Sequence, residues 1–343
     1  MQAMVLDRVA PLSENRTPLR LAEVPTPTPG DGEVLIRVAA CGVCHTELDE
    51  IEGRTPPARL PMILGHQVVG RVAARGPGAG RFILGDRVGI GWIHHACGAC
   101  DFCRNGRENL CASFAATGRD APGGYAQFTV VPQEFAYPIP EIFTDAEAAP
   151  LLCAGAIGYR SLALTEMRDG EILGLLGFGA SAHLVLKMVR HRYPAARVFA
   201  FSRTPGERDF ARELGADWAG GFDEAPPAPM HRAIDTTPVW GPVVAGLKHL
   251  ERGGRLVINA IRKEEADKAA LLTLDYAAHL WLEKEIKSVA NVARTDVSEF
   301  LALAAEMPIK PEIQEYGLAD ANRALVELKE RQIRGAKVLR MEQ

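Results

Sequence analysis

The chain has 343 residues, of which 47% are hydrophobic and 24% are charged, and its formal net charge is -4. This composition is typical of a globular protein that is long enough for two domains with separate cores. The small negative charge argues against nucleic acid or an anionic membrane as a partner. Charged residues, Asp7 and Arg8, interrupt the first stretch where a signal peptide would be apolar, so we expect a cytoplasmic protein.

The first part of the sequence is rich in short β-type runs. Residues 33–38, 67–72 and 85–90 alternate apolar and polar side chains, and the Pro-rich stretch 24–30 breaks any helix. Such alternation is typical of half-buried antiparallel strands. We therefore predict a mainly β domain over residues 1–150.

From about residue 151 the pattern changes to alternating strands and helices. Expected strands are 171–176, 197–201, 233–235 and 254–259, and expected helices include 183–189 and 243–250. This alternation predicts an α/β domain with a doubly wound parallel sheet over residues 151–290. Helices at 297–306 and 318–330 and a strand at 336–339 follow, and we expect residues 291–343 to return to the first domain.

A glycine-containing turn separates the first of these strands from its helix. It reads Gly177-Phe178-Gly179-Ala180-Ser181-Ala182, which matches G-x-G-x-x-A. Between a strand and a helix this motif predicts a nicotinamide dinucleotide site, because the turn brings backbone N–H groups close to the pyrophosphate.

Ser202 and Arg203 follow the next strand, where an NAD site normally has an acidic residue. A hydroxyl and a guanidinium suit the 2′-phosphate of NADP, so NADP is favoured over NAD. Two observations leave the alternative open, since Glu207 lies nearby and Arg203 is also consistent with an ordinary surface charge.

Four of the seven cysteines stand close together, at Cys97, Cys100, Cys103 and Cys111. Two x2 spacings and one x7 loop allow four thiolates to bind one zinc ion and to close its coordination shell, which predicts a structural site. Independent buried thiols and an iron–sulfur cluster are the alternatives.

A second group of ligand-type residues is dispersed along the chain. Cys44 begins the run Cys44-His45-Thr46, and His66 and Cys153 follow at a distance. A Cys/His/Cys set leaves a tetrahedral zinc with one open position, as in catalytic sites.

Together, these motifs resemble the zinc-dependent medium-chain alcohol dehydrogenases, and most closely the bacterial and cinnamyl-alcohol branch. The resemblance covers nearly the whole chain and implies a GroES-like catalytic domain, a Rossmann domain and a homodimer or homotetramer. It implies that Cys44, His66 and Cys153 bind the catalytic zinc, while Cys41 is a small buried residue. It also implies that His45 contacts the cofactor pyrophosphate and Thr46 the reacting alcohol.

Three positions depart from the family pattern. Gln67 replaces a Glu beside the zinc-binding histidine, which puts transient ligation there in doubt. Glu47 replaces Asp, is one methylene longer and can still orient a zinc ligand. Asp49 stands where many members have a proton-accepting His, so the outer end of a proton relay is uncertain.

The predicted function is hydride transfer between a zinc-bound alcohol or aldehyde and a nicotinamide cofactor, with two zinc ions per chain. One alternative is a zinc-independent quinone or enoyl reductase of the same fold, which would lack both ligand sets. Another is a non-catalytic relative that binds the cofactor. The sequence does not identify the alcohol or aldehyde, although Trp92 and Ile93 line the cleft by analogy.

Overall fold

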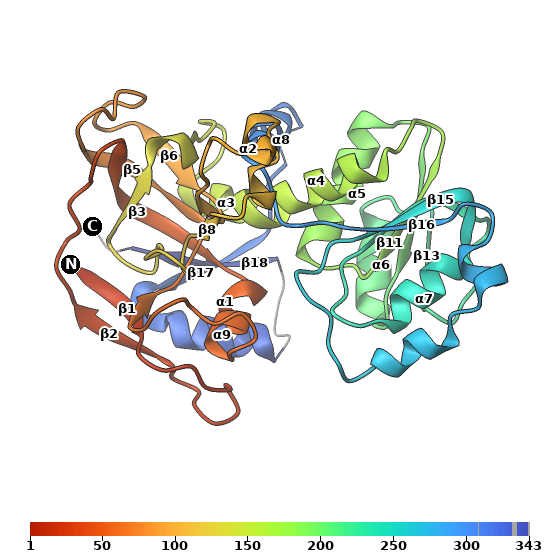
Figure 1. Ribbon diagram of the computed structural model, residues 1–343. Helices are drawn as coiled ribbons and strands as arrows, with labels where there is room; N and C mark the ends of the chain where they lie inside the picture. Colours follow the sequence, from red (N-terminus) through yellow and green to blue (C-terminus); the bar gives the residue numbers. More distant parts are fainter. Residues whose placement is uncertain (308, 331–334, 342–343) are drawn as a thin grey trace. The chain divides into compact units, whose positions relative to one another are not determined.

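The computed structural model describes residues 1–307, 309–330 and 335–341. The chain divides into two compact units, of which unit 1 comprises Met1–Cys153 and Ala293–Gln343 and unit 2 comprises Ala154–Val292. Figure 1 labels many of their helices and strands. No helix in the described part of the chain has the length and apolar character needed to cross a membrane.

Unit 1 is built mainly from antiparallel strands. Its strands are β1 (Gln2–Leu6), β2 (Leu19–Glu23), β3 (Glu33–Val43), β4 (Met62–Ile63), β5 (Val68–Arg75), β6 (Arg87–Ile90), β7 (Ile93–His95), β8 (Ala115–Ala116), β9 (Phe128–Pro132), β10 (Ala136–Pro138), β17 (Ile313–Gly317) and β18 (Ala336–Arg340). Its helices are α1 (His45–Ile51), α2 (Asp101–Arg104), α3 (Asp145–Pro150), α8 (Arg294–Glu306) and α9 (Ala321–Lys329).

The large sheet of unit 1 has β3 near its centre. The strand order is β10-β6-β5-β3-β18-β17, and β9 also pairs with β3. β3 is buried along most of its length because strands cover both of its edges. β18 runs antiparallel to β3, with Lys337 opposite Val43 and Leu339 opposite Cys41. The last strand of the chain therefore supports the residues that lead into Cys44.

Unit 2 is a parallel sheet connected by helices. Its strands are β11 (Ile172–Leu176), β12 (Arg197–Phe201), β13 (Trp218–Gly220), β14 (Met230–Asp235), β15 (Leu250–Ile258) and β16 (Glu285–Ser288), and its helices are α4 (Ala156–Thr165), α5 (Ala180–Arg192), α6 (Pro205–Glu213) and α7 (Gly241–Lys248). The order β13-β12-β11-β14-β15-β16 is that of a Rossmann domain. The predicted doubly wound parallel sheet is thus confirmed.

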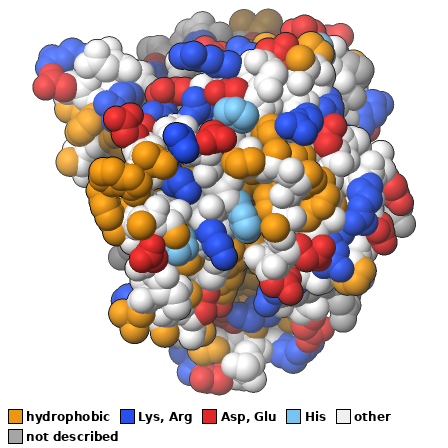
Figure 2. All heavy atoms as spheres, turned by 90° about the vertical axis from the view of Figure 1, so that its right-hand side faces the viewer, with side chains coloured by type: hydrophobic (Ala, Val, Ile, Leu, Met, Phe, Trp, Pro, Cys, Tyr) orange, Lys and Arg blue, Asp and Glu red, His pale blue; other side chains and the backbone are white. Residues whose placement is uncertain are grey.

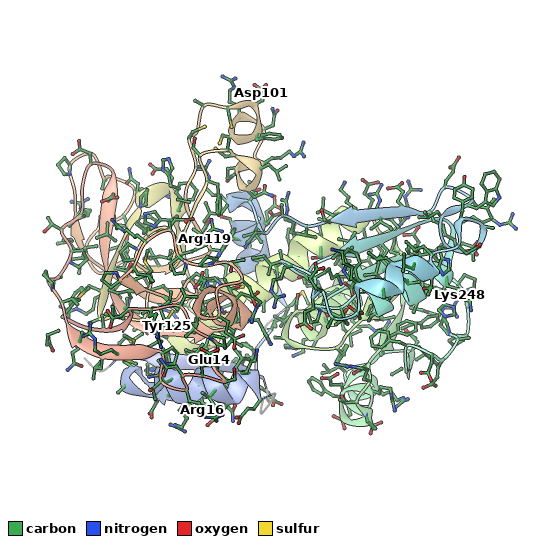
Figure 3. The ribbon with its side chains drawn as sticks, turned by 60° about the horizontal axis from the view of Figure 1, so that its bottom comes forward. Glu14, Arg16, Asp101, Arg119, Tyr125 and Lys248 are labelled. Carbon is green, nitrogen blue, oxygen red and sulfur yellow. The ribbon has the colours of Figure 1, made fainter. Side chains whose placement is uncertain are left out.

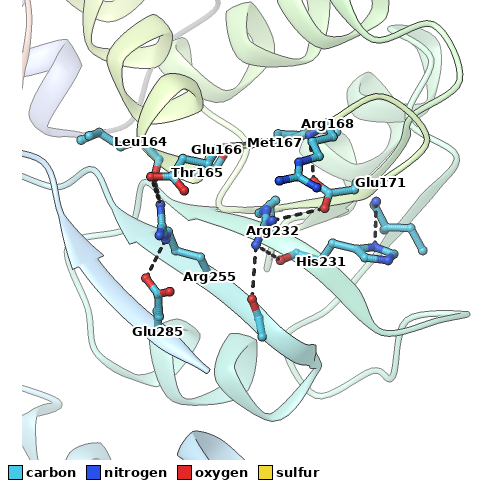
Figure 4. A network of polar contacts seen from close by, with 12 residues as sticks. Leu164, Thr165, Glu166, Met167, Arg168, Glu171, His231, Arg232, Arg255 and Glu285 are labelled. Carbon is cyan, nitrogen blue, oxygen red and sulfur yellow. Dashed lines mark hydrogen bonds and ion pairs between the residues drawn. The ribbon is translucent and has the colours of Figure 1, made fainter. Parts of the chain in front are cut away.

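Residues at the N-terminal ends of the parallel strands form a polar network (Figure 4). Arg255 contacts Glu285, Glu166 and the carbonyl of Leu164 at 2.8, 2.8 and 3.0 Å. A second arginine of the network, Arg232, lies 3.2 Å from Glu171. This network joins neighbouring strands near their N-terminal ends. The glycine turn lies at the opposite, C-terminal end of β11, so the network has a structural role.

Several element boundaries differ from those predicted. The predicted helix 243–250 is α7, which ends at Lys248, and Leu250 already belongs to β15. The helix predicted at 318–330 is a 3-10 turn over Leu318–Asp320 followed by α9. Apolar residues at these junctions satisfy a helical and a strand pattern equally, so tertiary pairing decides between them.

Candidate active site and metal centres

Cys44 lies between the end of β3 and the first residue of α1. Its backbone is extended, its N–H donates to Glu47 Oε2 at 2.8 Å, and its Sγ accepts from the N–H of Thr46 at 3.4 Å. The thiol therefore lies at the N-terminus of a short helix and accepts a hydrogen bond from one of its backbone N–H groups. Thr46 is half-buried and His45 exposed in the same turn.

His66 is placed by the glycine before it. Gly65 has φ +97°, and a Cβ at this position would lie 2.4 Å from the ring of Tyr125, so no larger residue fits. The imidazole of His66 is buried, with Nε2 at 3.7 Å from Cys44 Sγ and Nδ1 at 2.5 Å from Glu47 Oε1. Glu47 thus fixes the ring so that Nε2 is directed at Cys44, as a carboxylate does behind a zinc-binding histidine.

Cys153 completes this group from the π-helical turn Leu151–Gly155. The Sγ atoms of Cys44 and Cys153 and a ring nitrogen of His66 all lie within 4.8 Å of one another. Donors around a tetrahedral zinc are separated by about 3.5–3.8 Å, given Zn–S and Zn–N bonds of about 2.3 and 2.0 Å. The arrangement fits a zinc ion with three protein ligands. Cys41 is fully buried and lies outside this group.

The protonation of these donors is coupled to metal binding. A hydrogen bond with Cys153 and burial raise the pKa of the Cys44 thiol. Burial lowers the pKa of His66, but the negative charges of Glu47 and Cys44 outweigh it and the pKa is raised well above its ordinary value. Without metal the site therefore retains protons, and zinc must displace them on binding.

Two further carboxyl groups of α1, those of Asp49 and Glu50, are buried. Asp49 is buried, and its Oδ1 accepts from Arg54 Nε at 2.5 Å. Glu50 is fully buried, and neither of its oxygens has a hydrogen-bond partner among the described residues. Burial and the nearby Glu47 raise the pKa of Glu50 well above its ordinary value. Sequence reasoning missed Glu50 and Arg54, because their roles depend on which face of α1 is buried.

Gln67 packs against Gly42 of β3. Its Oε1 lies so close to Gly42 that a Cβ there would be 2.5 Å away, and its Nε2 has no partner among the described residues. Its carbonyl accepts from the N–H of Gly42 at 2.9 Å. Gln67 therefore contributes to the packing and hydrogen bonding of β3 at Gly42.

The four-cysteine lobe is also assembled. Cys103 Sγ lies 3.8 Å from Cys97 Sγ and 3.5 Å from Cys100 Sγ, and the donor atoms of all four cysteines lie within 4.8 Å of one another. These separations match a tetrahedral ion with Zn–S bonds of about 2.3 Å. An iron–sulfur cluster would place irons and sulfides between the thiolates and would hold them further apart. His94 and His95 belong to neither ligand group.

One residue of the lobe caps a distant helix. Glu108 is buried, and its Oε1 accepts from the backbone N–H and from Nε of Arg294, at 2.9 and 2.7 Å. Arg294 is the first residue of α8. Burial opposes ionisation of Glu108, but the hydrogen bonds from Arg294 outweigh it and lower its pKa. Asp101, at the outer tip of the lobe (Figure 3), is by contrast exposed.

The glycine turn lies at the C-terminal end of β11. Gly177 has φ +88°, and a Cβ there would meet Thr236 Oγ1 at 2.8 Å. A Cβ at Gly179 would meet nothing within 4 Å, and α5 begins at Ala180 with no side chain capping its first N–H groups. Open space in front of uncapped helical N–H groups fits a pyrophosphate. Phe178 is buried against the ring of Phe210.

Ser202 and Arg203 lie at the end of β12, as the sequence predicts. Ser202 is buried and its hydroxyl donates to Glu207, while Arg203 is exposed. Arg208 Nη1 donates to the carbonyls of Ser202 and Arg203 at 3.0 and 3.4 Å. The neighbourhood therefore contains two guanidinium groups and one carboxylate that already accepts a hydrogen bond. Arg208 was not identified from the sequence, because the turn of α6 brings it there.

Comparison with known proteins identifies the family. Residues 30–141 match the family described as alcohol dehydrogenase GroES-like domain. The chain is 42% identical over 344 residues to a probable alcohol dehydrogenase, AdhA, of Mycobacterium tuberculosis, covering 99% of this chain and 97% of the relative. This chain belongs to the zinc-dependent medium-chain alcohol dehydrogenase family.

Solved structures of the family agree with this assignment. A cobalt- and zinc-bound thermostable alcohol dehydrogenase from Pyrobaculum aerophilum has a TM-score of 0.87 at 26% identity, with 99% of each chain covered. An NAD-dependent alcohol dehydrogenase has a TM-score of 0.87 at 25% identity, with 100% of each chain covered. The predictions of a GroES-like domain, a Rossmann domain and an alcohol oxidoreductase with two zinc sites are confirmed.

Proposed function

We propose that this family member interconverts an alcohol and its aldehyde with NADP(H), using a zinc ion held by Cys44, His66 and Cys153. The observation that supports this most directly is the convergence of those three donors. When bound, zinc acts as a Lewis acid toward the substrate oxygen, and the nicotinamide carries the hydride. We assign the catalytic reaction to unit 1 and cofactor binding to unit 2, in line with the predicted domains 1–150 with 291–343 and 151–290.

The residues around the donors have distinct proposed roles. Thr46, two residues after Cys44 and in the first turn of α1, hydrogen-bonds the reacting hydroxyl and relays its proton by passing on the proton of its own hydroxyl, and His45 contacts the cofactor pyrophosphate. Asp49 is the proposed outer acceptor of that proton. Asp49 Oδ1 accepts from Arg54 Nε, and this hydrogen bond fixes the orientation of the carboxylate.

We further propose that NADP is preferred over NAD. Arg203 and Arg208 place positive charge at the end of β12, where a 2′-phosphate would lie. Glu207 opposes this preference, but its carboxylate accepts from Ser202. The backbone of Gly177, Phe178, Gly179 and Ala180 would receive the pyrophosphate in either cofactor.

A homodimer or homotetramer is the proposed assembly. β16 forms the edge of the parallel sheet, all four of its residues are exposed, and no described strand pairs with its outer side. Leu272, Trp281 and Ile286 are 89, 53 and 44% exposed in the same segment. Figure 2 shows hydrophobic side chains gathered on the face seen from the right of Figure 1. A second copy of the chain would cover such an edge.

A cytoplasmic location is part of the proposal. All seven cysteines are free thiols, and six of them lie in the two ligand groups. Thiols used in this way are typical of a reducing compartment.

The decisive experiment is an activity screen of primary, secondary and aromatic alcohols and aldehydes with NADP and NAD in parallel. Metal analysis of the same preparation is expected to give two zinc ions per chain, and one in Cys44→Ala. Turnover that survives in Cys44→Ala would support a zinc-independent reductase. Absence of any turnover in a fully metallated protein that binds NADPH would indicate a non-catalytic relative.

A further inference from the structure

A buried lysine of unit 2, Lys263, lies at the C-terminal ends of the parallel strands, where the glycine turn also lies. The ammonium of Lys263 contacts the carboxylate of Asp235, the last residue of β14, and donates to the carbonyls of Thr237 and Val239 at 2.8 and 2.9 Å. Its side chain is 8% exposed and that of Asp235 is 0% exposed. All three ammonium hydrogens thus have acceptors, and the pair is fully within the protein.

The residues after Lys263 hold the same loop at further points. The N–H of Glu264 donates to the carbonyl of Pro238 at 2.6 Å. Asp267 Oδ2 accepts from the N–H groups of Trp240 and Gly241, both at 2.8 Å, at the start of α7. Hydrogen bonds from the segment 263–267 therefore hold the loop 236–241 at each of its residues from 237 to 241.

This loop limits the space around the glycine turn. Thr236 Oγ1 and Thr237 Cγ2 would lie 2.8 and 2.9 Å from a Cβ at Gly177. The hydroxyl of Thr236 also donates to the carbonyl of Leu176, at 3.2 Å, directly before the turn. Any shift of the loop would consequently alter the backbone that faces the pyrophosphate.

We infer that Lys263 is a positioning residue of the cofactor site, which acts by holding the loop 236–241 against Gly177. This inference rests on the proposed use of a nicotinamide cofactor. The ammonium does not reach the cofactor in this role, because Asp235, Thr237 and Val239 take its three hydrogens. Lys263 therefore affects the affinity for the cofactor and does not affect the rate of hydride transfer.

The test compares Lys263→Met with Lys284→Met. Lys284 is a matched control, since its ammonium also donates to two backbone carbonyls of unit 2, those of Leu247 and Ala278, both at 3.0 Å. Leu247 lies near the end of α7 that is remote from the loop. NADPH affinity is measured by fluorescence titration, together with kcat at saturating cofactor and the melting temperature.

In Lys263→Met we expect the Kd for NADPH to rise about tenfold or more, while kcat at saturating cofactor stays within about threefold. Lys284→Met is expected to change the melting temperature without changing the Kd. The double variant Asp235→Asn/Lys263→Met removes the unpaired buried charge, so it should recover melting temperature but keep the weak Kd. Recovery of the Kd in the double variant, or an unchanged Kd in Lys263→Met, overturns the inference. Failure of the unmodified protein to bind NADPH or NADH would instead refute the proposed function.

Discussion

Glu47 makes contacts with two ligand residues at once. One oxygen accepts from the N–H of Cys44, and the other lies 2.5 Å from His66 Nδ1. The same carboxylate thus sets the start of α1 and the orientation of the imidazole. One contact stays at the start of α1, and the other reaches from α1 to the segment between β4 and β5, where His66 lies.

Replacing Glu47 by Gln is expected to weaken zinc binding at the Cys44 site by about 10–100-fold, because the imidazole loses its charged partner. Competition with a chromophoric chelator, on protein whose lobe stays metallated, gives the affinity. Glu50→Gln is the control, since Glu50 is a buried carboxyl of the same helix whose oxygens have no hydrogen-bond partner among the described residues. Equal affinities for the two variants would contradict the role given to Glu47.

At the end of β12 the proposed cofactor preference depends on two arginines. Arg203→Ala/Arg208→Ala is expected to reduce kcat/KM for NADP by about tenfold or more, while NAD changes little, because each guanidinium contact with a phosphate is charge-assisted. Initial rates with both cofactors measure this. Arg212→Ala, in the same helix but paired with Asp209, should leave the ratio unchanged. A parallel loss with both cofactors would disprove the assignment.

Several site residues follow from the sequence alone, and others do not. Cys44, the four lobe cysteines and the glycine turn are predictable because spacing or a short motif carries their chemistry. The pairing of Lys263 with Asp235 is not predictable, since it depends on which loops meet at the end of the sheet. The partners Glu108 and Arg294 are 186 residues apart, and no local pattern links them.

Among the elements, α8 has an unusual beginning. Its first N–H group is bonded by Glu108, which belongs to the four-cysteine lobe, and Asp296 accepts from the N–H of Ala293 at 2.6 Å. Helix N-termini favour carboxylates for their charge and their acceptor capacity. Loss of structure in the four-cysteine lobe should therefore also loosen the first turn of α8.

Glu108→Gln should lower the protection of the amides at residues 293–297 against hydrogen exchange, by about 1–3 kcal/mol for the loss of charged hydrogen bonds. Chelation of the lobe zinc in the unmodified protein should expose the same amides. Asp101→Asn provides a control, because its pair with Arg104 is exposed within the lobe. Unchanged exchange at 293–297 in Glu108→Gln would show that the cap is dispensable.

Element prediction succeeded where hydrophobic patterns were long. The β11 run and the α5 helix fall close to the predicted ranges, because a buried parallel strand is continuously apolar and a covering helix has a clear period. β16 was missed, since its residues are exposed and alternate weakly. The register of a strand and its position at the edge of a sheet depend on tertiary contacts, which the pattern of a single strand does not encode.

At the scale of the whole molecule, the exposed edge of the parallel sheet predicts self-association. Ile286→Lys with Trp281→Ser is expected to shift the protein toward a monomer, because a charge on an edge strand opposes strand pairing. Light scattering coupled to size exclusion measures the mass. Leu21→Ser, at an exposed apolar residue of unit 1, is the control. An oligomer of unchanged mass in the β16 variant would place the interface elsewhere.

The pairing of β18 with β3 bears on the order in which the protein acquires structure during synthesis. Unit 2 is continuous in sequence, whereas unit 1 needs residues from both ends of the chain. Val43, the neighbour of Cys44, pairs with Lys337 of β18, so β3 gains this partner only after residue 337 has been synthesised. Unit 2 is thus able to fold from a continuous stretch of chain before β3 has its full set of neighbours, and the support of Cys44 by β18 comes later.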